Sequence, residues 1–140
     1  MKYILIIVVL FFSLPLNSQS VLGYWKTYTK NNQEQALIKI YKEDGLIHAR
    51  IIKALDPTLS GMICTKCKGK NKDKPIKGMT IIKNLIKKGR KLYSGYALNP
   101  LNGKYYKCRV SFKNENILKL RGYIGFSLLG RTEYWYRVRE

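Results

Sequence analysis

The chain has 140 residues, of which 46% are hydrophobic and 12% are aromatic, and its formal net charge is +19 at pH 7. This composition is too apolar for a disordered chain, and the length suits one packed domain rather than two. The positive charge is the property that needs an explanation.

The first twenty residues differ from the rest of the chain. An unbroken apolar run covers residues 4–12, and small and polar residues follow it. Because this run is much shorter than the roughly 20 residues of a spanning helix, it predicts a secretory signal peptide over residues 1–20, cleaved after Ser18 or Ser20, rather than a retained membrane anchor. We therefore expect an exported protein, periplasmic or secreted, with a single domain over residues 21–140 and no membrane-spanning segment after cleavage.

Lysines are spread along the whole predicted domain, with clusters at residues 66–70 and 83–91. The solvated outer face of an antiparallel sheet produces such a spread, and lysines on exposed strands discourage edge pairing. The alternative is electrostatic docking on an anionic membrane or cell-wall polymer. Export makes nucleic acid the least suitable anionic partner.

Short alternating segments begin directly after the predicted leader. Residues 23–28 form the first, and in the next Ala36, Ile38 and Ile40 alternate with Leu37, Lys39 and Tyr41. Asp44-Gly45 then supplies the positive φ angles of a tight hairpin turn, and a third alternating segment covers residues 46–55. These segments predict a β-meander.

The second half continues this pattern after one interruption. Residues 56–78 lack periodicity and predict a long loop, and residues 79–86 suit either a strand or a helical turn. Further strands are expected at residues 92–98, 105–113, 117–123 and 131–138, with a hairpin loop at 99–104 and a glycine-marked corner near Gly125. The pattern predicts an all-β fold, a closed antiparallel up-and-down β-barrel of about eight strands; a sandwich is the alternative, and sequential hairpins favour the barrel.

The two ends of the predicted domain are expected to meet. In a closed meander with an even number of strands, the beginning of the first strand lies beside the end of the last. Arg137 is then the cation that lies over the Trp25 ring and closes one end of the barrel; the alternative is that Trp25 is an ordinary core aromatic. This Gly23-x-Trp25 start with a terminal arginine resembles the lipocalin and wider calycin barrels, a resemblance that implies binding of small apolar ligands.

Five segments in order extend this resemblance over most of the chain. They are Gly23-Tyr-Trp-Lys-Thr, Asp73-Lys-Pro-Ile-Lys-Gly78, Asn99-Pro-Leu-Asn-Gly-Lys-Tyr105, Arg121-Gly-Tyr-Ile-Gly125 and Leu129-Gly-Arg-Thr-Glu-Tyr-Trp135. Together they resemble the family of small exported bacterial proteins catalogued as domain of unknown function 2147. The resemblance implies a lipocalin-like barrel and export, and no established activity. Asn99 stands where the family pattern has aspartate before proline, so a role that needs a carboxylate there does not carry over.

Three cysteines remain to be assigned. In an oxidising compartment three thiols give one disulfide and one leftover, which favours a Cys64–Cys67 disulfide with Cys108 buried as a small hydrophobe. A bridge from Cys108 to the loop, a metal site and a redox site are the alternatives. Zinc lacks a fourth ligand, since the single histidine, His48, belongs to another hairpin, so no metal and no cofactor are predicted.

No catalytic constellation emerges from the remaining residues. Most carboxylates lie in turns or near the chain ends, His48 is expected on the surface, and Glu133 is expected to pair with neighbouring arginines. The sequence therefore predicts a non-catalytic protein that binds a small apolar or amphiphilic molecule inside its barrel. The candidate lining residues are Ile38, Ile40, Tyr106, Val110, Phe112 and Leu120. Because Arg137 is assigned to closure, the search for a ligand site turns to the opposite mouth and to the Cys64 loop.

Overall fold

The computed structural model describes residues 20–123 and 130–139. Most of the predicted signal peptide (residues 1–19) and the predicted corner at Gly125 lie outside these residues. Among the described helices, none is long and apolar enough to cross a membrane.

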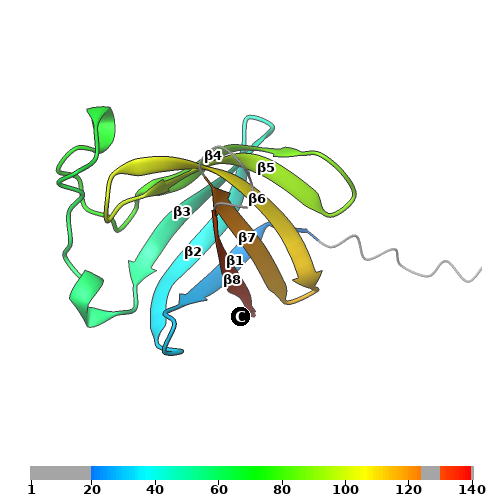
Figure 1. Cartoon of the computed structure of the whole chain (residues 1–140), viewed down its shortest axis with the longest axis horizontal. Helices are drawn as coiled ribbons and strands as arrows, with labels where there is room; N and C mark the ends of the chain where they lie inside the picture. The colour runs from blue at the N-terminus through cyan, green and yellow to red at the C-terminus, as the bar shows by residue number, and fades with distance from the viewer. Residues whose placement is uncertain (1–19, 124–129, 140) are drawn as a thin grey trace, which may run out of the picture.

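Eight antiparallel strands within the described residues close into a barrel, in which each strand pairs with its sequence neighbours and the last pairs with the first (Figure 1). The strands are β1 (Gly23–Tyr28), β2 (Glu34–Glu43), β3 (Leu46–Ala54), β4 (Thr80–Lys87), β5 (Leu92–Asn99), β6 (Lys104–Asn114), β7 (Ile117–Tyr123) and β8 (Gly130–Val138). The predicted closed up-and-down barrel is confirmed, and the ambiguous segment after residue 79 is a strand.

Period-two patterning decides which side chains fill the barrel. In β2, Ala36, Ile38 and Ile40 are buried, and in β3 Ala49 and Ile51 are buried. Successive side chains of a strand point to opposite faces, so the intervening residues face outward. The interior is therefore an apolar core that the alternating segments predict.

Strand β4 departs from this regular pattern. Its register shifts against both neighbours, and Asn84, with a φ of 53°, lies in the interrupted stretch next to the buried Leu85. The backbone N–H of Asn84 donates to Nδ1 of His48 on β3, at 3.3 Å. A bulge of this kind breaks the period-two pattern, which explains why the sequence leaves a strand and a helical turn equally possible here.

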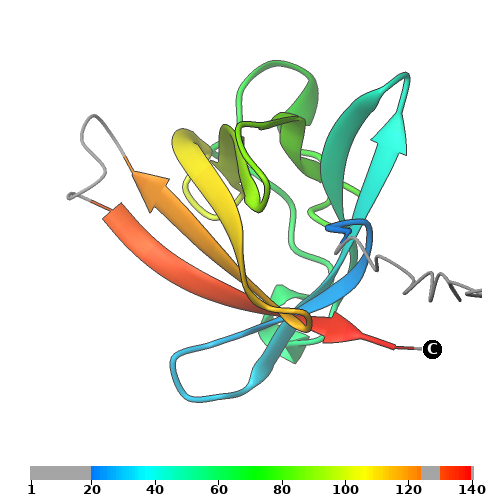
Figure 2. The same ribbon diagram turned by 90° about the vertical axis from the view of Figure 1, so that its right-hand side faces the viewer.

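The barrel has two unlike ends. The hairpin end carries the β2–β3, β4–β5 and β6–β7 turns together with the start of β1 and the end of β8, and Figure 2 shows β7 and β8 side by side along their length. The loop end carries the β1–β2 and β5–β6 turns and the long segment between β3 and β4. That segment contains two short 3-10 helices, η1 (Pro57–Leu59) and η2 (Gly69–Asn71), and it extends beyond the strands (Figure 1).

Candidate functional site

The closure of the hairpin end is built from β1 and β8. Trp25 is fully buried opposite Arg137, whose guanidinium carbon lies 4.3 Å from the centre of the indole ring. The indole Nε1 donates to the carbonyl of Val21 at 2.9 Å. Gly23 has a φ of 130°, and a Cβ there would lie 3.5 Å from Arg137 Nη1. The stacking predicted from the sequence is therefore present, and the open side of Gly23 faces the guanidinium.

Arg137 also fastens the segment that leads into β1. Its Nη2 donates to the Ser20 carbonyl at 2.7 Å, its Nη1 to the Leu22 carbonyl at 3.4 Å and its Nε to the Glu115 carbonyl at 3.1 Å. Burial, with the charge of Arg139 as a smaller cause, lowers the pKa of Arg137 from its usual value. The guanidinium of Arg137 thus donates hydrogen bonds to carbonyl groups of two segments, which would otherwise lack hydrogen-bond partners at the barrel end.

A cavity of about 430 Å³ lies at the same hairpin end. Buried Val21, Leu85 and Tyr93 contribute to its wall, and the exposed Leu46 and Ile86 also line it. The full lining is Ser20, Val21, Leu22, Lys42, Gly45, Leu46, Ile47, Leu85, Ile86, Lys87 and Tyr93. The segment that Arg137 fastens therefore forms part of this wall, so the closure shapes the cavity. The sequence directs the search to the opposite mouth and to the Cys64 loop, where a second cavity, described below, also lies.

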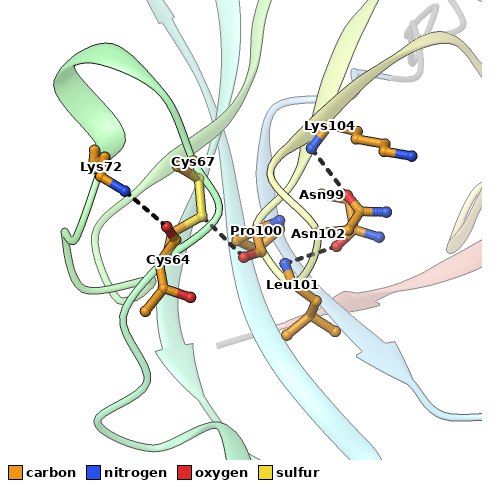
Figure 3. The surroundings of a disulfide bond; sticks show 9 residues. Cys64, Cys67, Lys72, Asn99, Pro100, Leu101, Asn102 and Lys104 are labelled. Carbon is orange, nitrogen blue, oxygen red and sulfur yellow. Dashed lines mark hydrogen bonds between the residues drawn. A yellow bond between two sulfur atoms is a disulfide. The ribbon is translucent and has the colours of Figure 1, made fainter.

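The loop end is organised by the Cys64–Cys67 disulfide, as predicted (Figure 3). Both cysteines are buried, and Sγ of Cys64 lies 3.0 Å from the carbonyl oxygen of Pro100 in the β5–β6 turn. A disulfide sulfur carries no proton, so this is a close sulfur–oxygen contact rather than a hydrogen bond. The disulfide loop is therefore seated on the β5–β6 turn.

Gly103 makes this seating possible. Its φ is 69°, and a Cβ at this position would lie 2.0 Å from the carbonyl oxygen of Lys66. Only a residue without a side chain permits both the left-handed backbone and this close approach. Gly103, which belongs to the hairpin loop predicted at residues 99–104, is thus also the point at which the disulfide loop approaches this turn.

These features agree with the comparisons to known proteins. The family model described as "Uncharacterized protein conserved in bacteria (DUF2147)" matches residues 23–137. The chain belongs to this family. Among solved structures, protein HP1028 of Helicobacter pylori, described as belonging to the lipocalin family, superposes with a TM-score of 0.73 at 21% identity, covering 86% of this chain and 84% of that one. This likeness shows a lipocalin-like fold. No curated protein matches the chain.

Asn99, which is expected from the sequence to depart from the family pattern, has a structural role. The Asn99 side-chain oxygen accepts the backbone N–H of Leu101 at 2.9 Å, and the Asn102 oxygen accepts that of Lys104 at 3.0 Å (Figure 3). An aspartate at position 99 would accept the same hydrogen bond. The residue shapes the turn on which the disulfide loop sits.

The predicted ligand-lining residues lie elsewhere in the barrel. Ile38, Ile40, Val110 and Leu120 are buried, whereas Phe112 and Tyr106 are partly buried. None of them lines the hairpin-end cavity or the lysine-lined one described below. Their packing into the interior follows the sequence pattern, and their role in ligand binding stays a prediction. Three residues of the hairpin-end cavity, Ser20 to Leu22, belong to the region that is assigned from the sequence to the surroundings of a cleavage site, so no sequence signal marks them as a ligand site.

Cys108 is the remaining thiol, free and 2% exposed. Burial raises its pKa to about 11, while a backbone hydrogen bond from Gly95 acts in the opposite direction. Because the thiolate is the reactive form, this environment suppresses nucleophilic and redox chemistry at Cys108. The predicted assignment of this cysteine as a buried small residue is consistent with its place between β5 and β7.

The other titratable candidates have structural partners. His48 packs against the Tyr41 ring at 5.6 Å and accepts the hydrogen bond from β4. Glu133 lies 3.9 Å from Arg131, with half of its side chain exposed. Among the described residues no group of three or more His, Cys, Asp or Glu side chains is placed to hold a metal ion.

The outer face carries cations over tyrosine rings. Three pairs join adjacent strands, Lys39 over Tyr24, Arg50 over Tyr41 and Arg109 over Tyr123, and a fourth, Lys113 of β6 over Tyr134 of β8, reaches across β7; the cations lie 4.9 to 5.8 Å from the ring centres. Such pairs stabilise a sheet surface by about 0.5–1 kcal/mol each when exposed. Some of the positively charged residues therefore stabilise the outer surface of the barrel.

Proposed function

We propose that this protein is an exported, non-catalytic binding protein that holds the tail of a small amphiphilic molecule in the hairpin-end cavity. The single observation that supports this proposal most strongly is the concentration of exposed apolar side chains there. Leu22, Leu46 and Ile86 are 37%, 43% and 53% exposed, and all three line the same cavity. Exposed apolar groups gathered at a concave site are typical of ligand binding.

The size and floor of the cavity support a ligand with an apolar tail. Its volume of about 430 Å³ lies within the range of small-molecule pockets, and buried Val21, Leu85 and Tyr93 line it. Transfer of an alkyl chain from water to such a surface is favourable by about 0.8 kcal/mol for each buried CH₂ group. The tail therefore supplies most of the binding free energy in this proposal.

The cations of the cavity define the head group. Lys42 and Lys87 line the cavity on the β2–β3 and β4–β5 sides, and among the residues that the structure describes no carboxylate lines it. Lysine side chains donate to carboxylate or phosphate oxygens while their stems cover apolar surface. The proposed ligand class is thus an anionic amphiphile such as a medium-chain fatty acid.

The decisive experiment measures binding of dodecanoate and dodecanol to the purified protein by titration calorimetry. The variant Leu46→Glu/Ile86→Glu places two negative charges in the cavity, and its matched control, Ile63→Glu/Leu101→Glu, alters two similarly exposed apolar residues outside it. We expect about tenfold or greater weakening of dodecanoate binding in the first variant and none in the control. If the wild-type protein takes up neither compound, or if the two variants bind alike, the proposal is wrong.

A second pair of measurements examines the head group and the compartment. Lys42→Gln/Lys87→Gln should weaken dodecanoate more than dodecanol, and dodecanol binding should change little with salt because its capture is apolar. Native mass spectrometry of protein isolated from the periplasm should show a bound amphiphile and a chain that begins near residue 19 or 21. Docking on an anionic membrane or polymer through the lysine surface, the alternative function, would instead weaken steeply with salt.

A further inference from the structure

A second cavity lies at the loop end, away from the proposed amphiphile site. Its volume is about 360 Å³, and four exposed lysines line it, Lys70 in η2, Lys74 and Lys77 in the following loop and Lys83 in β4. The other lining residues are Asn71, Pro75, Gly78, Met79 and Thr80, so no carboxylate from the described part of the chain contributes to the wall. The cavity is therefore a concave and uniformly cationic surface.

The charge of this region is not neutralised by its surroundings. Between residues 66 and 91 the sequence has eleven lysine and arginine residues and a single acid, Asp73. The ion pairs found within residues 20–123 and 130–139 are Lys26 with Glu34 and Arg131 with Glu133, which lie on other strands. Like charges held close together destabilise the segment that carries them, and a bound anion removes that cost.

The backbone that carries the lysines is firmly held. The Lys74 carbonyl accepts the N–H of Cys64 at 2.8 Å, and the N–H of Gly78 donates to the Ile51 carbonyl at 2.7 Å. Between these points Ile76 is 4% exposed, and its N–H donates to the Met62 carbonyl at 3.0 Å. The disulfide fixes the other side of the loop. The stems of Lys74 and Lys77 thus start from fixed positions, which lowers the entropic cost of gathering them around a ligand.

We propose that this cavity is a binding site for a phosphoryl compound with two or more negative charges. Lysine ammonium groups act as point charges with three donors each, and cations arriving from η2, the loop and β4 suit the several oxygens of a phosphoryl group better than one planar carboxylate. The volume exceeds that of a single phosphoryl group, which leaves room for a second one or for the moiety that carries it. This site is independent of the amphiphile site.

The test compares two variants of equal charge. Lys70→Gln/Lys74→Gln/Lys77→Gln/Lys83→Gln removes the cavity cations, whereas Lys30→Gln/Lys104→Gln/Lys107→Gln/Lys119→Gln removes four exposed lysines from other parts of the surface. Binding of inorganic pyrophosphate is measured by titration calorimetry at constant ionic strength, with acetate as the monovalent reference. Co-sedimentation with vesicles that contain phosphatidic acid, a phosphomonoester that carries up to two negative charges, forms the second arm and separates a lipid head group from a free phosphoryl compound.

We expect the cavity variant to bind at least one of these probes about tenfold more weakly than the wild type, and the surface variant to bind within about twofold of it. Pyrophosphate binding that depends on the cavity identifies a free phosphoryl ligand, and vesicle binding alone that depends on it identifies a head group. Equal weakening in both variants would mean that diffuse surface charge is responsible and would overturn the proposal. Failure of the wild type to bind either probe would overturn it as well.

Discussion

The two ends of this barrel are closed by different physical means. At the hairpin end a buried indole ring, one guanidinium and three carbonyl groups complete the core around Trp25 and Arg137. At the loop end a disulfide and backbone hydrogen bonds fix the shape of a long segment, which contacts the β5–β6 turn at Pro100 and Gly103. Both ends bury side chains, but the hairpin end adds the stacked guanidinium of Arg137 to this burial, whereas the loop end adds a disulfide and backbone hydrogen bonds.

This difference matches the cavity at each end. Side-chain packing at the hairpin end leaves an apolar cavity beside the closure, while the constrained loop presents a cationic one. Damage to the hairpin end should therefore reduce the stability of the whole barrel. Damage to the loop end should mainly free a segment that lies outside the strands.

The largest effect is expected for Trp25→Ala. The side chain is completely buried, and its removal should lower the free energy of unfolding by about 3–5 kcal/mol, measured by urea denaturation. Trp25→Phe keeps a ring but loses the hydrogen bond to Val21, which should cost about 1 kcal/mol or more. Trp135→Phe is the control, because within the described residues the buried Nε1 of Trp135 has no hydrogen-bond partner to lose. Equal losses for the two phenylalanine variants would contradict the special role of Trp25.

A pair of glycine substitutions compares the ends directly. Gly103→Ala meets the Lys66 carbonyl, so it combines backbone strain with a clash and should cost about 2–4 kcal/mol. Gly45→Ala, in the β2–β3 turn, has a similar φ of 78° but no atom within 4 Å of the added Cβ, so it should cost only about 1–2 kcal/mol.

Limited proteolysis should locate the damage in these two variants. The loop of Gly103→Ala is expected to be cleaved near Lys66 while the barrel stays intact. Identical protection of the loop in the two variants would show that it is not seated on the β5–β6 turn in solution.

Cys108 lies in the barrel interior between the two ends, and ionisation of its thiol should make the free energy of unfolding depend on pH. Its pKa is about 11 in the folded protein, above the ordinary value of 9.0, so the folded state retains a proton that the unfolded state releases between these pH values. The contribution of the thiol to stability is therefore complete below pH 9 and is lost as the pH rises towards 11, by up to about 2–3 kcal/mol.

The measurement compares wild type and Cys108→Ala by urea denaturation from pH 8 to pH 11, since titrations of lysine and tyrosine are common to both proteins. The stability advantage of the wild type should shrink across this range. Parallel curves would show that the thiol is not buried as described.

The sequence predicts the regular parts of this molecule because short-range patterning decides them. Alternation in β2 and β3 places Ile38 and Ile51 in the core, and the Asp44-Gly45 turn has the expected positive φ values of 51° and 78°. The stacking of Arg137 on Trp25 follows from antiparallel closure alone. These features depend on the alternation of apolar and polar residues along a strand, on the residues that form turns, and on the rule that the first and last strands of such a barrel pair antiparallel.

The cavities depend on arrangements that no local pattern encodes. The apolar one needs the β4 bulge at Asn84, which turns Leu85 inward, and it needs the chain before β1 to fold back under Arg137. The cationic one needs the particular path of the loop that brings Lys70 near Lys83. Sequence alone shows the lysines and the apolar residues, but their gathering around two separate cavities follows from long-range contacts.

The smallest global effect is expected for Cys64→Ala/Cys67→Ala. The disulfide closes a loop of only four residues, for which the chain-entropy model gives about 2 kcal/mol, and this stabilisation applies mainly to the segment rather than to the strands. The fluorescence of buried Trp25 should therefore stay native, whereas proteolysis at the lysines of the loop and loss of pyrophosphate binding should appear together. Retention of dodecanoate binding in the same variant would separate the two ends, because the hairpin-end cavity contains no residue of the loop. Simultaneous loss of both ligands would instead show that the ends are energetically coupled through the strands, and the division between side-chain closure and covalent closure would then be wrong.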